Sequence, residues 1–182
     1  MIKNVFFSAI IIAAFSFNPG CRKTAVGINS NPGFILSSPV IGTDSLLPLD
    51  YTCRGSSSSL PLSWRGVPEG TVSLALVMYH FASPTDIHCY WIIYDIPAET
   101  DSLTKNATGI GKMGINSVNG KMQYTPPCSQ GPGLRDYCFT LYALSGHPQF
   151  SIEPDSVNRS AILNAIKDIT ISSATLKVYY TW

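Results

Sequence analysis

The feature that most constrains the fold of this chain is a nearly unbroken apolar and aromatic run from Tyr137 to Leu144. A charged pair, Arg135 and Asp136, stands at its start, and Gly133 and Gly146 punctuate its two sides. Runs of this length and composition are typical of strands that are buried on both faces. The run therefore predicts an interior strand of a covered β-sheet.

A second run of the same kind spans residues 90–97 and ends at Pro97, which cannot donate to a sheet ladder. We expect it to be the direct neighbour of the first run. Shorter strand signals cover residues 34–38, 73–79 and 176–181, and the second of these follows a turn signal at residues 67–70.

One helix is expected near the C-terminus, with Asp155 or Ser156 as its N-cap. Its apolar residues recur at helical spacing: Ile162, Ala165, Ile166 and Ile169. Strands followed by one or two short helices predict a mainly β sandwich rather than an alternating α/β fold.

The N-terminal residues 1–20 combine one lysine with a short apolar stretch and are typical of a signal peptide. Cys21 follows the small residue Gly20, which resembles a bacterial lipoprotein processing site, although Asn18 and Pro19 depart from that pattern. Lipidation of Cys21, ordinary cleavage nearby and an uncleaved anchor all place the domain outside the cytoplasm. Residues 21–32 are expected to form a tether and residues 33–182 one domain, lipid-anchored to the cell envelope.

The charge of the chain argues against nucleic acid as a partner. Its net charge is +1, and only 13% of its residues are charged. A nucleic-acid binder needs a basic stripe to neutralise phosphates, and this sequence has none.

The chain has five cysteines, and lipid on Cys21 would leave four that can pair. Cys89 and Cys138 lie in or beside the two core runs, so a bridge between neighbouring strands is one possibility. Cys53 and Cys128 lie in loops rich in Gly, Pro and Ser, so the other bridge would join two loops. Buried free thiols and metal ligation stay open as alternatives, although no CxxC spacing supports a metal.

No residue pattern indicates catalysis, a cofactor or a metal site. The Ser56–Ser59 run has a flexible loop composition and lacks the strand-to-helix context of a nucleophile elbow. The three histidines are scattered, and Asp86 and Asp136 have no spacing that supports an acid–base pair. We therefore expect a protein that is not an enzyme.

Polar side chains instead gather at the predicted strand ends, where we expect a binding site. The candidates are His80, His88, Tyr90, Arg135 and Asp136. The long passage between residues 100 and 133 is rich in Gly and Pro, as is common for segments that build sites.

Several ordered motifs resemble a known family. They are Tyr51-Thr52-Cys53-Arg54-Gly55, residues 61–68, 73–76 and 91–98, Gly114-Ile115-Asn116, Pro127-Cys128, and residues 139–144. In this order they are similar to the phosphatidylethanolamine-binding protein family, in its bacterial Raf-kinase-inhibitor-like branch. The resemblance implies a Greek-key β-sandwich with a small surface pocket for anions such as phosphate head groups.

The same resemblance implies that the family's pocket is rewritten here. Its Asp-Pro-Asp-x-Pro segment falls on residues 80–84, so His80 replaces the first aspartate and only Pro84 is kept. Its strand histidine falls on Tyr90, and its His-Arg pair becomes Arg135-Asp136. Two arginines, Arg135 and Arg54, now stand where a histidine and an aspartate are usual.

Two binding hypotheses follow. In the first, the tethered domain holds a small anionic ligand through Arg135, with weak or no binding of phosphatidylethanolamine head groups. In the second, the pocket has no ligand and the domain is a protein-interaction or inhibitor module. In an alternative without a binding role, Arg135 only forms a surface ion pair with Asp136 or another carboxylate.

Overall fold

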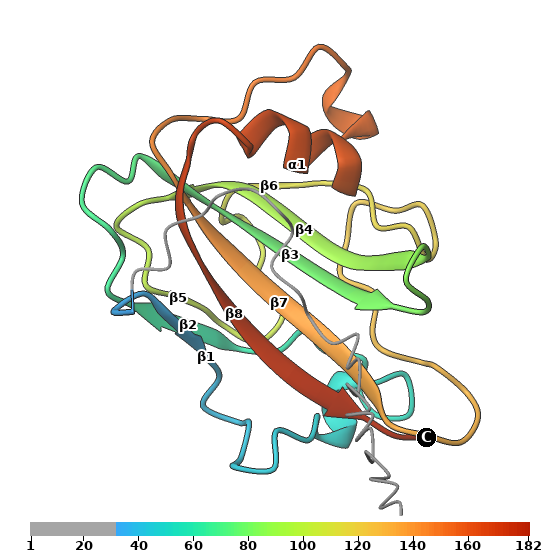
Figure 1. The fold of residues 1–182 in the computed structure, drawn as a ribbon. Coiled ribbons are helices and arrows are strands. Elements are labelled where there is room, and N and C mark those ends of the chain that lie inside the picture. Colours follow the sequence, from blue (N-terminus) through green and yellow to red (C-terminus); the bar gives the residue numbers. More distant parts are fainter. Residues whose placement is uncertain (1–31) are drawn as a thin grey trace, which may run out of the picture.

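A computed structural model of the 182-residue chain describes residues 32–182. Eight strands form two antiparallel sheets, shown in Figure 1. The three-stranded sheet has the order β1 (Ile35–Ser37), β2 (Leu62–Arg65), β5 (Ser102–Leu103). The five-stranded sheet has the order β6 (Lys112–Met113), β4 (Ile87–Pro97), β3 (Ser73–Phe81), β7 (Arg135–Leu144), β8 (Thr170–Tyr180). Two 3-10 turns, η1 (Leu49–Tyr51) and η2 (Pro154–Ser156), and one helix, α1 (Arg159–Ile166), complete the fold, so the mainly β prediction is confirmed.

The larger sheet is covered on both faces, which explains why its inner strands β3, β4 and β7 lack alternation. On one face, Leu76 and Met78 belong to the same apolar cluster as Trp64 of the smaller sheet. On the other face, the alternate residues of β3 pack in a cluster that includes Ile162 and Ile166 of α1. Ile162 and Ile166 of the predicted helix stripe are thus buried, whereas Ala165 is half-buried and Ile169 lies beyond the end of α1. Helix α1 lies over one end of the sheet in Figure 1.

The expectation that the two core runs are direct neighbours is wrong, because β3 lies between β4 and β7. Tyr79 of β3 pairs with Cys89 on one side and with Cys138 on the other. Strands β3 and β4 are joined by a short hairpin, closed by a bond from Ala82 N to Asp86 O of 2.9 Å. The β3–β4 hairpin, whose strands are adjacent in sequence, therefore forms instead of the expected direct pairing between β4 and β7.

Two boundaries also differ from the prediction. Asn158 caps the helix, since its side-chain oxygen accepts from Ala161 N at 3.0 Å, whereas Asp155 and Ser156 lie in η2. Strand β8 begins at Thr170 and not at residue 176, because its first half pairs with the end of β7.

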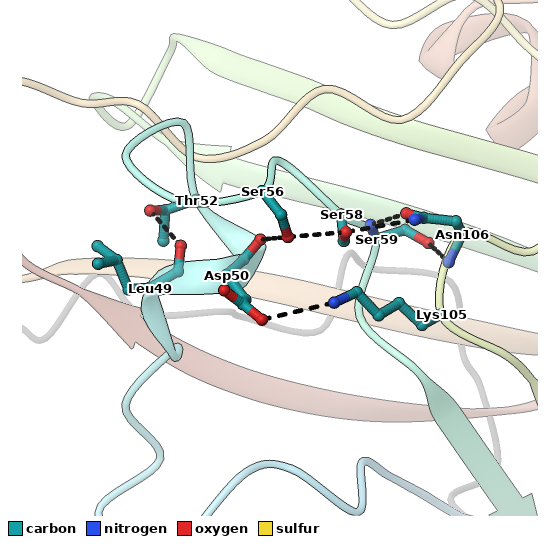
Figure 2. A network of polar contacts seen from close by, with 8 residues as sticks. All are labelled: Leu49, Asp50, Thr52, Ser56, Ser58, Ser59, Lys105 and Asn106. Atoms are coloured by element: carbon teal, nitrogen blue, oxygen red, sulfur yellow. Dashed lines mark hydrogen bonds and ion pairs between the residues drawn. The ribbon is translucent and has the colours of Figure 1, made fainter.

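Three serines of the run take part in a network of polar contacts, as Figure 2 shows. Ser58 and Ser59 are buried. Asn106 donates to Ser58 Oγ at 3.2 Å, and its side-chain oxygen accepts from Ser59 N at 2.9 Å. The Ser56 hydroxyl donates to the Asp50 carbonyl at 3.0 Å. These bonds fix the loop that follows η1 to the segment after β5.

The predicted signal peptide, the lipidation site Cys21 and nearly all of the predicted tether lie outside the described residues. Within residues 32–182, no helix has the length and apolar character needed to cross a membrane.

Candidate functional site

Of the five polar candidates and Pro84 of the family segment, four line one cavity of about 510 Å³: His80, His88, Arg135 and Asp136. They come from three adjacent strands, since His80 ends β3, His88 begins β4 and the other two begin β7. His80 and His88 are direct partners across the hairpin. Strand ends therefore bring the polar residues together, as the sequence predicted.

His80 is oriented by the backbone of the neighbouring strand. Its ring is 6% exposed, stacks on Tyr137 with a centroid distance of 5.0 Å, and has Nδ1 2.7 Å from the Asp136 carbonyl oxygen. A carbonyl can only accept, so Nδ1 carries the proton. Nε2 is then the ring nitrogen that remains for a ligand, as an acceptor in the neutral ring and as a donor in the protonated ring.

The carboxylate of Asp136 lies close to a lysine and a histidine side chain. One oxygen lies 3.5 Å from Lys177 Nζ on β8, and the other lies 3.7 Å from His80 Nδ1. Lys177 therefore offsets the negative charge that Asp136 brings to the cavity.

Arg135 is the uncompensated charge of the site. Its side chain is half-buried, and its guanidinium makes no hydrogen bond or ion pair with any other residue in the part of the chain that the structure describes. The alternative in which Arg135 forms a surface ion pair with Asp136 is therefore not met within residues 32–182. A guanidinium without a carboxylate partner at a cavity wall is suited to bind an oxyanion.

Tyr90 and Pro84 do not line the cavity. Tyr90 is buried beneath it, where its hydroxyl interacts with Tyr137 and with Ser129, and Ser129 Oγ lies 3.0 Å from the Tyr137 hydroxyl. Burial raises the pKa of both tyrosines well above their ordinary value, so each hydroxyl stays protonated. Pro84 lies in the exposed hairpin turn between β3 and β4.

The remaining cavity wall was not predicted residue by residue. It consists of Phe81, Ala82, Ser129, Gln130 and Leu134. Ser129 and Gln130 fall within the irregular Gly- and Pro-rich passage, whose composition was the only signal for them.

The cysteines follow the prediction in part. Cys53 and Cys128 form the expected disulfide between loops, with Cα atoms 5.3 Å apart. Cys89 is a free, buried thiol, so the expected bridge between Cys89 and Cys138 is wrong. Because both lie opposite Tyr79 on different sides of β3, they are separated by two strand spacings, roughly 10 Å, and a disulfide requires less than about 7 Å.

The other charged side chains near the site make local contacts. His88 Nε2 lies 3.2 Å from an Asp86 carboxylate oxygen at the exposed hairpin, and His147 lies far along the chain beside Asp95, at 3.1 Å. Within residues 32–182, no group of three or more His, Cys, Asp or Glu side chains could hold a metal ion.

The fold and the cavity thus define a two-sheet β protein with an oxyanion-compatible pocket at the ends of β3, β4 and β7. The family model described as "Phosphatidylethanolamine-binding protein" matches residues 37–181. This chain therefore belongs to the phosphatidylethanolamine-binding protein family.

Relatives and solved structures agree with this assignment. A UPF0098 protein of Methanothermobacter thermautotrophicus is 33% identical over 135 residues, which cover 71% of this chain and 87% of the relative. A Mycobacterium tuberculosis protein named as a candidate lipoprotein, LppC, is 29% identical over 60% of this chain and 54% of its own length.

Two crystal structures share the fold. A candidate homologue from Chlamydia trachomatis, CT736, has a TM-score of 0.74 and 26% identity, covering 82% of this chain and 98% of that one. Escherichia coli YbcL, described as a member of the mammalian family, has a TM-score of 0.73 at 24% identity, covering 82% and 99%.

Proposed function

We propose that this protein is a non-enzymatic binder of small oxyanions, held at a bacterial envelope membrane by lipid on Cys21. The observation that carries the binding proposal is Arg135, which lines the cavity and has no anionic partner within residues 32–182. Its planar fork can donate two parallel hydrogen bonds to a phosphate or a carboxylate. The relative named as a candidate lipoprotein supports the envelope location.

The other polar groups of the cavity suit the same ligand class. Ser129 and Gln130 can each offer a donor beside the guanidinium, and His80 can do so through Nε2 when its ring is protonated. Asp136, the only carboxylate in the wall, is already close to Lys177. A ligand with an ammonium group would find no free carboxylate there and would meet the charge of Arg135. We therefore expect inorganic phosphate and simple carboxylates to bind better than phosphoethanolamine.

The contacts of Ser129 support a binding role rather than a catalytic one. A serine nucleophile needs an adjacent general base. Within the described residues, the Ser129 hydroxyl contacts the hydroxyls of Tyr137 and Tyr90, which burial keeps protonated.

The test is calorimetric titration of phosphate, acetate and phosphoethanolamine into the wild type and into Arg135→Gln. A charge-assisted hydrogen bond contributes about 1.5–3 kcal/mol, so the variant should bind phosphate roughly 10- to 100-fold more weakly. Arg65→Gln, an exposed arginine on β2, is the matched control and should bind like the wild type.

Equal phosphate affinity in the wild type and Arg135→Gln would refute the assignment of the site. An empty cavity, together with capture of a partner protein by the folded domain, would favour the interaction-module alternative. Tight phosphoethanolamine binding that survives Arg135→Gln would show that the family's ligand set has been transferred to the wrong positions.

A further inference from the structure

We propose that the Cys53–Cys128 disulfide is a redox control of the anion cavity: its reduction by an external dithiol releases one wall of the cavity and weakens anion binding. This inference rests on the proposed function and concerns the regulation of the same site. It depends on three observations, which are the firm attachment of Cys53, the sparse attachment of the loop after Cys128, and the position of that loop in the cavity wall.

Cys53 lies on a firmly held segment. The loop from Leu49 to Ser59 is tied to the segment after β5 by the network of Figure 2, which holds the buried Ser58 and Ser59 and in which Lys105 lies 3.5 Å from an Asp50 carboxylate oxygen. The chain closes tightly at Gly55, where an added Cβ would lie 2.2 Å from the Leu49 carbonyl oxygen. The Cys53 amide also donates to the Pro127 carbonyl at 3.0 Å.

The loop of residues 128–134, in contrast, has few attachments of its own. Within residues 32–182, its only hydrogen bonds are those of the Ser129 hydroxyl to Tyr137 and Tyr90. Gly131 and Gly133 adopt positive φ angles of 102° and 104°, and residues 130–134 are exposed. Figure 1 shows this loop extending away from the sheet before it enters β7. The Cys53–Cys128 disulfide and the bond from Cys53 N to the Pro127 carbonyl are therefore the attachments at the start of the loop, and the disulfide is the covalent one.

This loop supplies one wall of the cavity. Ser129 and Gln130 directly follow Cys128, and Leu134 directly precedes Arg135. Opening the disulfide removes the covalent attachment of the first two residues to the η1 loop and leaves only the Cys53 N–Pro127 O and Ser129 hydroxyl bonds, so their donors are held less firmly relative to Arg135. Ordering the released loop around the anion then costs conformational entropy, which weakens binding.

Reduction is chemically accessible because Cys128 is exposed and Cys53 is half-buried. A thiolate of the external dithiol attacks the sulfur of Cys128, and Cys53 leaves as a thiolate that takes up a proton. The second thiol of the reductant then attacks the mixed disulfide and releases Cys128. Two electrons pass to the cysteines, and the dithiol becomes a disulfide.

The first measurement compares the inorganic phosphate affinity of the wild type with that of Cys53→Ser/Cys128→Ser. Loss of one positioned donor and of preorganisation should weaken binding about tenfold. Cys89→Ser is the matched control, because Cys89 is a free thiol outside this cavity and its replacement should leave the affinity unchanged. Near- and far-UV circular dichroism establish that each variant is folded.

The second measurement uses only chains with the native cysteines and so decides the case if the double variant does not fold. Coupling between two equilibria is reciprocal, so saturating phosphate should oppose reduction of Cys53–Cys128 by the same factor of about ten. Alkylation followed by peptide mass analysis reports the redox state of these two cysteines. Arg135→Gln should show no phosphate effect.

The outcomes separate the two proposals. Phosphate binding that is equally tight with and without the disulfide, or no phosphate effect on reduction of the wild type, would overturn the redox control alone. Failure of the oxidised wild type to bind phosphate at all would overturn the proposed anion site and this inference with it.

Discussion

The buried free thiol of Cys89 should lower the free energy of unfolding of the domain at alkaline pH. Its side chain is 1% exposed and donates weakly to the Trp91 carbonyl at 3.9 Å. Burial raises the pKa of Cys89 from 9.0 to about 11, and the Trp91 hydrogen bond and the charge of Arg159 lower it only in part. Between these two values the unfolded chain loses a proton that the folded chain keeps. The free energy of unfolding therefore falls as the pH rises through this window.

The magnitude follows from the size of the shift. Each pH unit between the two pKa values costs about 1.4 kcal/mol, so about 1.4 kcal/mol is lost at pH 10 and about 2.7 kcal/mol above pH 11. Cys89→Ala removes this contribution, while its packing defect lowers stability equally at every pH. The stability difference between wild type and variant should thus narrow by about 1.4 kcal/mol from pH 8 to pH 10.

The assay is urea unfolding of both proteins at pH 8, 9 and 10, followed by circular dichroism. Tyrosine ionisation affects both proteins alike and cancels in the difference. Recovery of the native signal on dilution shows that the exposed thiolate has not exchanged with the disulfide. A stability difference that stays constant between pH 8 and pH 10 would refute the argument from burial.

The remaining predictions concern the serine loop and the N-terminus. Asn106→Ala leaves the N–H of the buried Ser59 without its partner and should lower the free energy of unfolding by about 1–3 kcal/mol, whereas the exposed Asn164→Ala should change it by less than about 0.5 kcal/mol. Urea midpoints measure both, and equal midpoints would contradict the role given to the network. Cys21→Ser should move the protein from the membrane fraction to the soluble fraction, and an unchanged distribution would argue against lipidation.

The strands of the core could be predicted because burial on both faces requires apolar residues. Strands β4 and β7 are apolar along most of their length because both faces are covered there, so their composition identified them. Because both faces are buried, the sequence of these strands has no pattern that indicates which strands they pair with. A strand with one exposed face signals its register through alternation, but a strand buried on both faces does not. The placement of β3 between them, and hence the separation of Cys89 from Cys138, could not be inferred from composition.

The candidate site was predictable where it is built by strand ends. His80, His88, Arg135 and Asp136 are polar residues at the ends of apolar runs, and the sheet brings them to one edge. The loop wall could not be predicted in the same way, because its position depends on a disulfide partner 75 residues away in the sequence. Lys177, which is half-buried, was also missed, since a single lysine on an alternating strand has no distinguishing signal.

Lys177 nevertheless affects the charge of the site without lining it. Cys138 is its direct strand partner, so its ammonium group reaches the carboxylate of Asp136 across the β7–β8 pair, at 3.5 Å. Asp136 is also the sequence neighbour of Arg135, and a free carboxylate there would compete with any ligand for the guanidinium. By pairing with Asp136, Lys177 leaves Arg135 available. The availability of the arginine is therefore a property of three strands: β7 carries both charged residues, β8 neutralises the acidic one, and β3 contributes the histidine that donates to the Asp136 carbonyl.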